Sequence, residues 1–198
     1  MSTLSLAADG VFHTLQGEGH LLGQPMTFVR LAGCSVGCAG CDTNYQKVRR
    51  ASVDEIMEEI RQSMPIARVR EPWVWITGGE PADQDLAPLV RALKRDHFSV
   101  AVATSGIKRI SVPVDWLSVS PHGALSMRWG NEIKIVPGLN GLDAERWIAE
   151  NDETIDFWLR FLQPLDGDAN SLEECLWIQS RFPHWGLTLQ AHKIWNVP

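Results

Sequence analysis

Short apolar runs, separated by polar segments and by Gly or Pro, are the main pattern of this chain. Runs such as Trp-Val-Trp-Ile at 73–76 and Val-Ala-Val-Ala at 100–103 lack the polar alternation of a half-exposed strand. Such runs are typical of strands covered on both faces, as in a parallel sheet flanked by helices. The predicted strands are residues 26–31, 73–77, 99–104, 116–120, 132–136, 157–162 and 186–190.

Helical periodicity fills several intervals between these runs. Residues 52–64 carry an apolar stripe, and Ser52 with Glu55 makes a capping-box pattern at its start. A second helix is predicted from about Asp83 to Asp96, and shorter ones at 143–150 and at 171–181, the last with a further box at Ser171 and Glu174. Strands that alternate with helices predict an α/β fold with a mostly parallel sheet of about six to seven strands.

Length and composition limit this fold further. The chain has 198 residues, 44% of them hydrophobic and 21% charged, which is typical of one globular domain spanning 1–198. A full eight-fold barrel takes roughly 250 residues, so we expect a partial TIM-like (β/α) barrel.

Charge and hydropathy exclude several classes of partner. The formal charge is −6 and the pI is about 5.5, whereas a surface that binds nucleic acid displays clustered Lys and Arg. No apolar run approaches the roughly 18 residues of a membrane span, and residues 1–10 lack the pattern of a secretory signal. We therefore expect a cytoplasmic protein that contacts neither nucleic acid nor membrane directly.

Three of the four cysteines lie in a C-x3-C-x2-C loop directly after the first predicted strand, at Cys34, Cys38 and Cys41. Three thiolates can ligate three irons of a 4Fe-4S cluster and leave one iron open for an exogenous ligand. The alternative is a structural zinc site closed by His122 or His192, in a binding module without catalysis. Because no second closely spaced pair of ligands follows, the spacing favours the cluster.

The fourth cysteine, Cys175, belongs to the predicted helix at 171–181 and shares a helical face with Leu172 and Leu176. A free cysteine at such a position is most often a small buried core residue. We expect that role for Cys175.

Gly78-Gly79-Glu80-Pro81 ends the strand predicted at 73–77. Ligands of parallel α/β sheets bind at such strand ends, and glycines permit a close approach of the backbone. Glu80 could accept hydrogen bonds from an ammonium group. By itself the segment also fits an ordinary turn into a helix.

The cysteine loop and the Gly-Gly-Glu-Pro segment together resemble the radical S-adenosylmethionine (SAM) superfamily. The resemblance implies that the amino and carboxylate groups of SAM chelate the open iron. One-electron reduction then breaks the C5′–S bond and yields a 5′-deoxyadenosyl radical. It also implies a low-potential reductant such as a flavodoxin or a ferredoxin. One position departs from the superfamily, because the residue before the third cysteine, often aromatic, is Gly40 here.

Further segments narrow the resemblance. They are Phe-His-Thr-Leu-Gln-Gly-Glu-Gly at 12–19, Cys-Asp-Thr at 41–43, Thr-Ser-Gly at 104–106, Ser-Pro-His at 120–122 and Gln-Ala-His-Lys at 190–193. This pattern is similar to the 7-carboxy-7-deazaguanine synthase family of queuosine and deazapurine biosynthesis. The similarity implies conversion of 6-carboxy-5,6,7,8-tetrahydropterin to 7-carboxy-7-deazaguanine with loss of ammonia, by a homodimer. A rival with the same SAM chemistry is a glycyl-radical-enzyme activase, which would not need Gln16 or Arg30.

The same resemblance implies a set of site residues. The cluster ligands are Cys34, Cys38 and Cys41. The SAM-binding residues are Gly40, Cys41, Asp42, Gly78, Gly79, Glu80, Ser120, Pro121, His122, Gln163, Pro164, Leu165 and Asp166, although the family often has Lys where His122 stands. The substrate-binding residues are Leu15, Gln16, Gly17, Glu18, Arg30, Thr77 and Pro198, the last through its terminal carboxylate.

The residues themselves suit these roles. Gln16 offers an amide to the edge of a pterin, and Arg30 could bind a carboxylate as a bidentate fork. Thr43 resembles the family's hydroxyl ligand for Mg²⁺, a cation that prefers oxygen. The alternatives are a surface turn at 16–19, a strand-edge salt bridge for Arg30, and a turn cap for Thr43.

Overall fold

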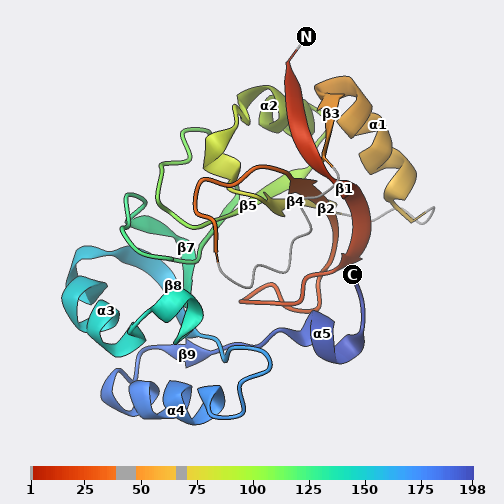
Figure 1. The fold of residues 1–198 in the computed structure, drawn as a ribbon. Coiled ribbons are helices and arrows are strands. Elements are labelled where there is room, and N and C mark those ends of the chain that lie inside the picture. The colour runs from red at the N-terminus through yellow and green to blue at the C-terminus, as the bar shows by residue number, and fades with distance from the viewer. Residues whose placement is uncertain (1, 39–47, 66–70) are drawn as a thin grey trace.

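A computed structural model of the chain describes residues 2–38, 48–65 and 71–198. Within these ranges, nine strands form one sheet in the order β3-β1-β2-β4-β5-β6-β7-β8-β9 (Figure 1). The strands are β1 Thr3–Leu15, β2 Pro25–Leu31, β3 Val48–Ser52, β4 Trp73–Gly78, β5 Ser99–Thr104, β6 Trp116–Val119, β7 Trp129–Ile135, β8 Asp156–Leu162 and β9 Gly186–Leu187.

The sheet is mixed and open. Neighbouring strands from β2 through β4 to β9 pair in parallel, whereas β1 pairs antiparallel with both β2 and β3. The edge strands β3 and β9 do not pair with each other in the described part of the chain. The predicted α/β class with a mostly parallel sheet is therefore confirmed.

Two strands were not predicted, β6 ends one residue earlier than predicted, and the last strand is much shorter than predicted. β1 contains a register shift between Leu6 and Val11, so its side chains do not follow one regular alternation. β3 is a polar edge strand, Val-Arg-Arg-Ala-Ser, without an apolar run. The last predicted strand, 186–190, ends at Leu187 in the structure.

Helices connect several of the strands. They are α1 Val53–Ser63, α2 Ala87–Arg95, α3 Ala144–Asn151, α4 Ser171–Arg181 and α5 Ala191–Trp195, with short 3-10 turns at Pro81–Asp83, Leu139–Gly141 and Asp152–Thr154. α2 begins four residues later than predicted, at Ala87, because Pro81–Asp83 forms a separate turn and the backbone at Gln84 is extended. In the ranges described, no helix has the length and apolar character needed to cross a membrane.

The two predicted capping boxes have different outcomes. At α1 the box is present, because Ser52 Oγ accepts the Glu55 N–H at 3.3 Å and Glu55 Oε2 accepts the Ser52 N–H at 2.7 Å. At α4 the prediction was wrong, because Ser171 is already the first helical residue and no side chain caps the helix at Asn170. Ser171 Oγ instead accepts the N–H of Leu165 at 2.7 Å and so fastens the segment after β8.

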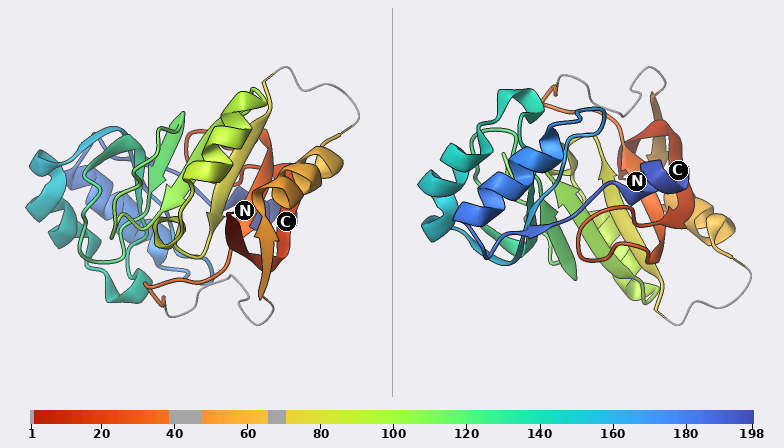
Figure 2. Two further views of the ribbon diagram at one scale, coloured as in Figure 1. Left: turned by 90° about the horizontal axis from the view of Figure 1, so that it is seen from above. Right: turned by 90° about the horizontal axis from the view of Figure 1, so that it is seen from below.

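Both faces of the sheet are covered, as the apolar runs predicted. Val74 and Ile76 of β4 belong to a large core that includes side chains from α1, α2, α3 and α4. Trp75, between them, points to a second cluster on the opposite face, formed with Met26, Phe28, Ala101 and Trp116. Figure 2 shows α3 and α4 side by side at one end of the sheet and α1 at the other end.

Cys175 lies in the large core, as predicted, and has no exposed surface. The face assigned to it was wrong, because Leu172 and Leu176 are 50% and 47% exposed. The buried residues of α4 are Ser171, Cys175 and Ile178. Burial raises the pKa of the Cys175 thiol to about 12.

This pKa predicts that Cys175 is unreactive in the folded protein. At pH 8 its thiolate fraction is on the order of 10⁻⁴, and the thiolate is the nucleophile. Iodoacetamide is therefore expected to label Cys34 and Cys38 in cluster-free protein and to reach Cys175 only after unfolding in urea, as measured by peptide mass mapping. Cys175→Ala is the control, which should lose one label in urea and none in buffer. Rapid labelling of Cys175 in the folded chain would contradict the burial described.

Candidate active site

A cavity of about 500 Å³ opens at the carboxyl ends of the parallel strands, which is the usual size of a ligand site. Its floor includes Phe28 and Trp75 of the second cluster, so it lies on the sheet face away from α1 to α4. The predicted site residues that line it are Leu15, Gln16, Gly17, Glu18, Arg30, Cys34, Cys38, Thr77, Gly78, Gly79, Glu80, Ser120, His122, Gln163, Leu165, Asp166 and Pro198.

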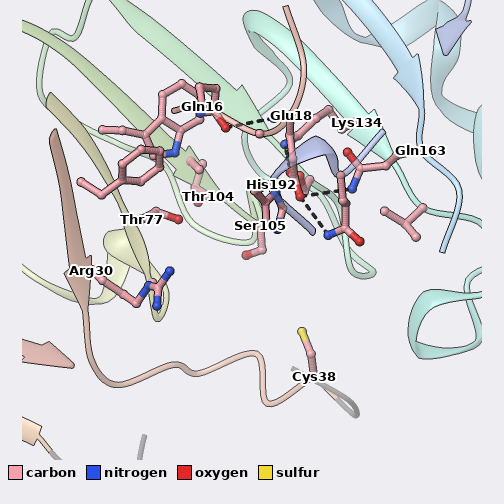
Figure 3. A pocket seen from close by; sticks show the side chains of 18 of the residues that line it. Gln16, Glu18, Arg30, Cys38, Thr77, Thr104, Ser105, Lys134, Gln163 and His192 are labelled. Atoms are coloured by element: carbon pink, nitrogen blue, oxygen red, sulfur yellow. Dashed lines mark hydrogen bonds and ion pairs between the residues drawn. The ribbon is translucent and has the colours of Figure 1, made fainter. Parts of the chain in front are cut away.

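Among the residues that the structure describes, two predicted site residues are not part of this lining. Pro121 and Pro164 neighbour lining residues without contributing to the cavity wall. Gly40, Cys41, Asp42 and Thr43 lie outside the described residues. Figure 3 shows Gln16, Glu18 and Lys134 on one side of the cavity, with Cys38 set apart from them.

The cysteine loop is fastened to the turn that follows β4. Ser35 donates its backbone N–H and its hydroxyl to Asp83, at 2.7 and 2.9 Å, and Lys108 pairs with the same carboxylate. Partial burial acts to raise the pKa of Asp83, but the hydrogen bonds from Lys108 and Ser35 lower it below its usual value. Asp83 is thus an ionised anchor beside Cys34, and sequence reasoning did not single it out.

The glycines after β4 pack directly on the cysteine loop. The Gly79 N–H donates to the carbonyl of Leu31 at 2.8 Å, and the Glu80 N–H donates to the carbonyl of Gly33 at 3.0 Å. A Cβ atom added to Gly79 would lie 1.9 Å from that Gly33 oxygen. Gly78 has a φ of +98°, which favours glycine. Only glycines allow the two segments to come this close.

Glu80 is buried and its carboxylate is fully engaged. Oε1 accepts the Thr104 hydroxyl at 2.6 Å and the Ala82 N–H at 2.9 Å. Oε2 accepts the Ser105 N–H at 2.9 Å and the Ser105 hydroxyl at 2.5 Å. Glu80 therefore ties the end of β4 to the end of β5. Its contact with the SAM ammonium stays a prediction, and the structural part of Thr104 and Ser105 was not foreseen.

His122 reaches the cysteine loop from the other side of the cavity. Its Nδ1 lies 3.6 Å from Cys38 Sγ and 3.1 Å from Asn140 Nδ2. Burial lowers the pKa of His122, although the Glu80 carboxylate acts in the opposite direction. The imidazole is therefore a polar group placed beside a predicted cluster ligand.

Gln16, Gly17 and Gly19 are buried and Glu18 is partly buried, so the alternative of a surface turn is wrong. Gln16 is only 4% exposed, and its Oε1 accepts the Glu18 N–H at 3.1 Å. Its Nε2 is buried and has no hydrogen-bond partner among the described residues. Gly17 lies against His192, where an added Cβ would be 2.2 Å from the ring Nδ1. A buried amide donor without a partner is costly unless a ligand accepts from it.

Glu18 is held by residues from three other segments. Lys134 Nζ of β7 donates to Oε2 at 2.5 Å, while Gln190 and Gln163 donate to Oε1 at 2.9 and 3.4 Å. Lys134 was not predicted; its only signal was a lysine within a predicted buried strand. Figure 3 shows the interactions of Lys134 and Gln163 with Glu18 as dashed lines.

Glu18 and Lys134 each favour the charged form of the other, because they lie close together. Burial alone would raise the pKa of the Glu18 carboxyl, but the attraction and hydrogen bond of Lys134 dominate and bring it to about 2. Burial acts to lower the pKa of Lys134, yet Glu18 and Glu132 raise it. Since the pKa of Glu18 falls below its usual 4.5, this stabilisation is fully present above about pH 4.5 and is lost as the pH falls through about 2.

Arg30 lies at the edge of an aromatic wall. Its guanidinium is 4.8 Å above the ring of Phe12, which stacks on Phe28 with centroids 5.3 Å apart. The salt bridge considered as an alternative is also present, because Nη1 lies 2.5 Å from Asp9 Oδ2. A guanidinium has five N–H donors, so the pair with Asp9 leaves others for a ligand.

Comparison with known proteins identifies the family. No family model matches the chain. A 7-carboxy-7-deazaguanine synthase from Burkholderia multivorans is 31% identical over 98% of this chain and 100% of its own length. The chain belongs to the 7-carboxy-7-deazaguanine synthase family. Another synthase of this family, from Escherichia coli K12, is 32% identical over 94% of this chain and 96% of its own length.

A solved structure supports the same family. The crystal structure of QueE from Escherichia coli matches with a TM-score of 0.75 and 29% identity, over 96% of this chain and 95% of that one. The chain therefore shares the fold of QueE, with its open mixed sheet.

Proposed function

We propose that this chain converts 6-carboxy-5,6,7,8-tetrahydropterin to 7-carboxy-7-deazaguanine, with ring contraction and loss of ammonia, in queuosine biosynthesis. Family membership supports the reaction. The structural observation that carries it is one cavity, which joins the cysteine loop to a second wall of buried polar and aromatic groups. The open sheet with a ligand cavity on one face also agrees with a partial barrel of the radical-SAM type.

The residues present fit a 4Fe-4S cluster and SAM. Cys34 and Cys38 line the cavity, and Cys41 would be the third ligand. The close packing of Gly79 on Gly33 keeps the glycine segment against the loop that would hold the cluster. When bound and reduced, the cluster and SAM supply the 5′-deoxyadenosyl radical that starts the reaction. We assign Mg²⁺ to Thr43.

SAM would extend from the glycine segment over the ends of β6 and β8. Gln163 supports this placement, because its Oε1 is buried and has no partner among the described residues, so it is an acceptor available to a ligand. We assign to SAM the residues Gly40, Cys41, Asp42, Gly78, Gly79, Glu80, Ser120, Pro121, His122, Gln163, Pro164, Leu165 and Asp166.

The pterin would occupy the wall formed by β1, β2 and β4. Gln16 Nε2 would donate to a ring acceptor, and the remaining N–H groups of Arg30 would bind the 6-carboxylate. The apolar faces of Phe12, Phe28 and Trp75 suit a flat ring. Leu15, Gly17, Glu18, Thr77 and Pro198 complete the substrate side.

The cavity also weighs against the two rivals. A glycyl-radical-enzyme activase needs room for a protein loop and has no use for a buried glutamine aimed at a small ligand. A zinc module needs neither an aromatic wall nor Lys134. We further propose that a flavodoxin or ferredoxin reduces the cluster, that the enzyme acts in the cytoplasm, and that it is a homodimer.

One anaerobic assay tests the function. Reconstituted protein is incubated with SAM, dithionite, Mg²⁺ and 6-carboxytetrahydropterin, and the products are analysed by mass spectrometry. We expect 7-carboxy-7-deazaguanine and 5′-deoxyadenosine, and neither without iron reconstitution. SAM cleavage without the deazaguanine would refute the substrate, and bound zinc in place of iron would support the binding module.

A further inference from the structure

A buried ion pair joins the segment that carries Gln16 to distant parts of the fold. The Lys134 side chain is only 6% exposed and that of its partner Glu18, 116 residues earlier in the chain, is 22% exposed, so the ammonium is buried and the carboxylate is largely covered. Glu18 also receives hydrogen bonds from Gln163 at the end of β8 and from Gln190 just before α5. One carboxylate thus connects β7, β8 and the C-terminal segment.

The loop around Glu18 is held at nearly every residue. The Gly17 carbonyl accepts the Ala191 N–H at 2.8 Å, and the Gly19 N–H donates to the Thr188 hydroxyl at 2.9 Å. The His20 N–H donates to Glu132 Oε2 at 2.9 Å. We call residues 16–20 the substrate loop. Its conformation depends on β7 and on the residues around α5.

The position of Glu18 also fixes which end of the Gln16 amide is left without a partner, and Gln16 is one of the residues that line the cavity. The Glu18 N–H donates to Gln16 Oε1, so the carbonyl end of the amide is engaged within the loop. The donor end, Nε2, is the buried atom without a partner among the described residues. A shift of Glu18 would therefore rotate or withdraw the group assigned to the pterin.

The positive charge of Lys134 is necessary to hold Glu18 and the substrate loop in this arrangement. Two carboxylates, Glu18 and Glu132, act on one ammonium, and both raise the pKa of Lys134. If the ammonium is removed, no positive charge on residue 134 compensates the two carboxylates in this site. The loss of that charge strongly disfavours the folded arrangement of the loop. The substrate loop would then move toward solvent to hydrate Glu18.

We propose that Lys134 is a positioning residue that acts through Glu18 to hold Gln16 in place for the pterin ring, without taking part in SAM cleavage. The proposal rests on the proposed function, because it assigns the ligand of Gln16 to the pterin. It deepens that function by adding a residue of β7 to the determinants of substrate binding.

The test compares Lys134→Met, Glu18→Gln and the double variant with the unaltered enzyme. Lys134→Met is expected to raise KM for 6-carboxytetrahydropterin roughly 100-fold, the order of loss that follows a misplacement of about 1 Å. Reductive SAM cleavage without the pterin should stay within about twofold of the unaltered enzyme. The double variant should have a KM at least about tenfold lower than that of Lys134→Met, because it lacks both charges of the pair. Lys94→Met, which breaks the exposed pair with Asp115, is the control and should change neither value.

A second measurement does not depend on turnover. Hydrogen exchange followed by mass spectrometry should show faster exchange of the amides at 16–20 in Lys134→Met and slower exchange again in the double variant. If Lys134→Met does not fold, the same measurements are compared between Glu18→Gln and the double variant. An unchanged KM, or SAM cleavage that falls as far as turnover, would overturn the proposal. If the unaltered enzyme does not turn over the pterin while the exchange pattern is as expected, the proposed substrate is wrong and the positioning of the loop stands.

Discussion

Replacing Cys38 by serine is expected to prevent assembly of the 4Fe-4S cluster and to abolish turnover. Serine has no thiolate, and the two remaining cysteines cannot hold three irons of the cluster. The loss should exceed the roughly 100-fold effect of removing a hydrogen-bond partner outside the ligand set of a metal site. Iron content, the absorbance of the cluster and 5′-deoxyadenosine formation measure it after anaerobic reconstitution.

Cys175→Ala provides the matched control, because Cys175 is buried in the core and is not one of the residues that line the cavity. It should keep its iron, its absorbance and its SAM cleavage, with a loss confined to stability. Full iron incorporation by Cys38→Ser would remove this cysteine from the ligand set. Zinc binding by the unaltered chain, lost in Cys38→Ser, would favour the zinc module instead.

Gly79→Ala is expected to separate the glycine segment from the cysteine loop. The added Cβ would lie 1.9 Å from the Gly33 oxygen and 2.7 Å from the Gly33 carbonyl carbon, and backbone atoms cannot move aside as a flexible side chain can. Overpacking of this kind costs about 1–3 kcal/mol of stability. Because the added Cβ displaces Gly33 and with it the loop that carries Cys34, the affinity for SAM should fall by roughly 100-fold. Thermal unfolding of the cluster-free protein and SAM binding to the reconstituted protein measure the two effects.

Gly186→Ala is the matched control for this substitution. At Gly186 an added Cβ would meet the Phe161 ring at 3.4 Å, an ordinary contact. This variant should bind SAM normally. If Gly79→Ala melts and binds SAM like the unaltered protein, the close packing of β4 on the cysteine loop is not required for the site.

The parts of the fold that could be predicted were those with a local signal. The α1 capping box needs only Ser52 and Glu55, three residues apart, and it forms as predicted. The parallel strands were visible as apolar runs because both faces of the sheet are covered. β1 and β3 carried no such run, since one has a register shift and the other is a polar edge. The box at Ser171 failed because the hydroxyl found a partner outside the helix, in Leu165.

The site divides in the same way. The cysteine spacing and the Gly-Gly-Glu-Pro segment identify a chemistry because each depends on neighbours within a few residues, and the comparisons support the family that they indicated. Three of the four donors around Glu80 could not be foreseen, because they belong to Thr104 and Ser105 at the end of another strand.

The amino-acid sequence by itself thus determined the α/β class and the family of this protein, and it predicts the cluster ligands. Only the tertiary structure decided that Glu18 pairs with Lys134, that Arg30 contacts both Asp9 and Phe12, and that Gln16 Nε2 is buried without a partner among the described residues. The physical reason is that spacing along the chain encodes local geometry, whereas a buried charge or amide acquires its partner only when distant strands are brought together.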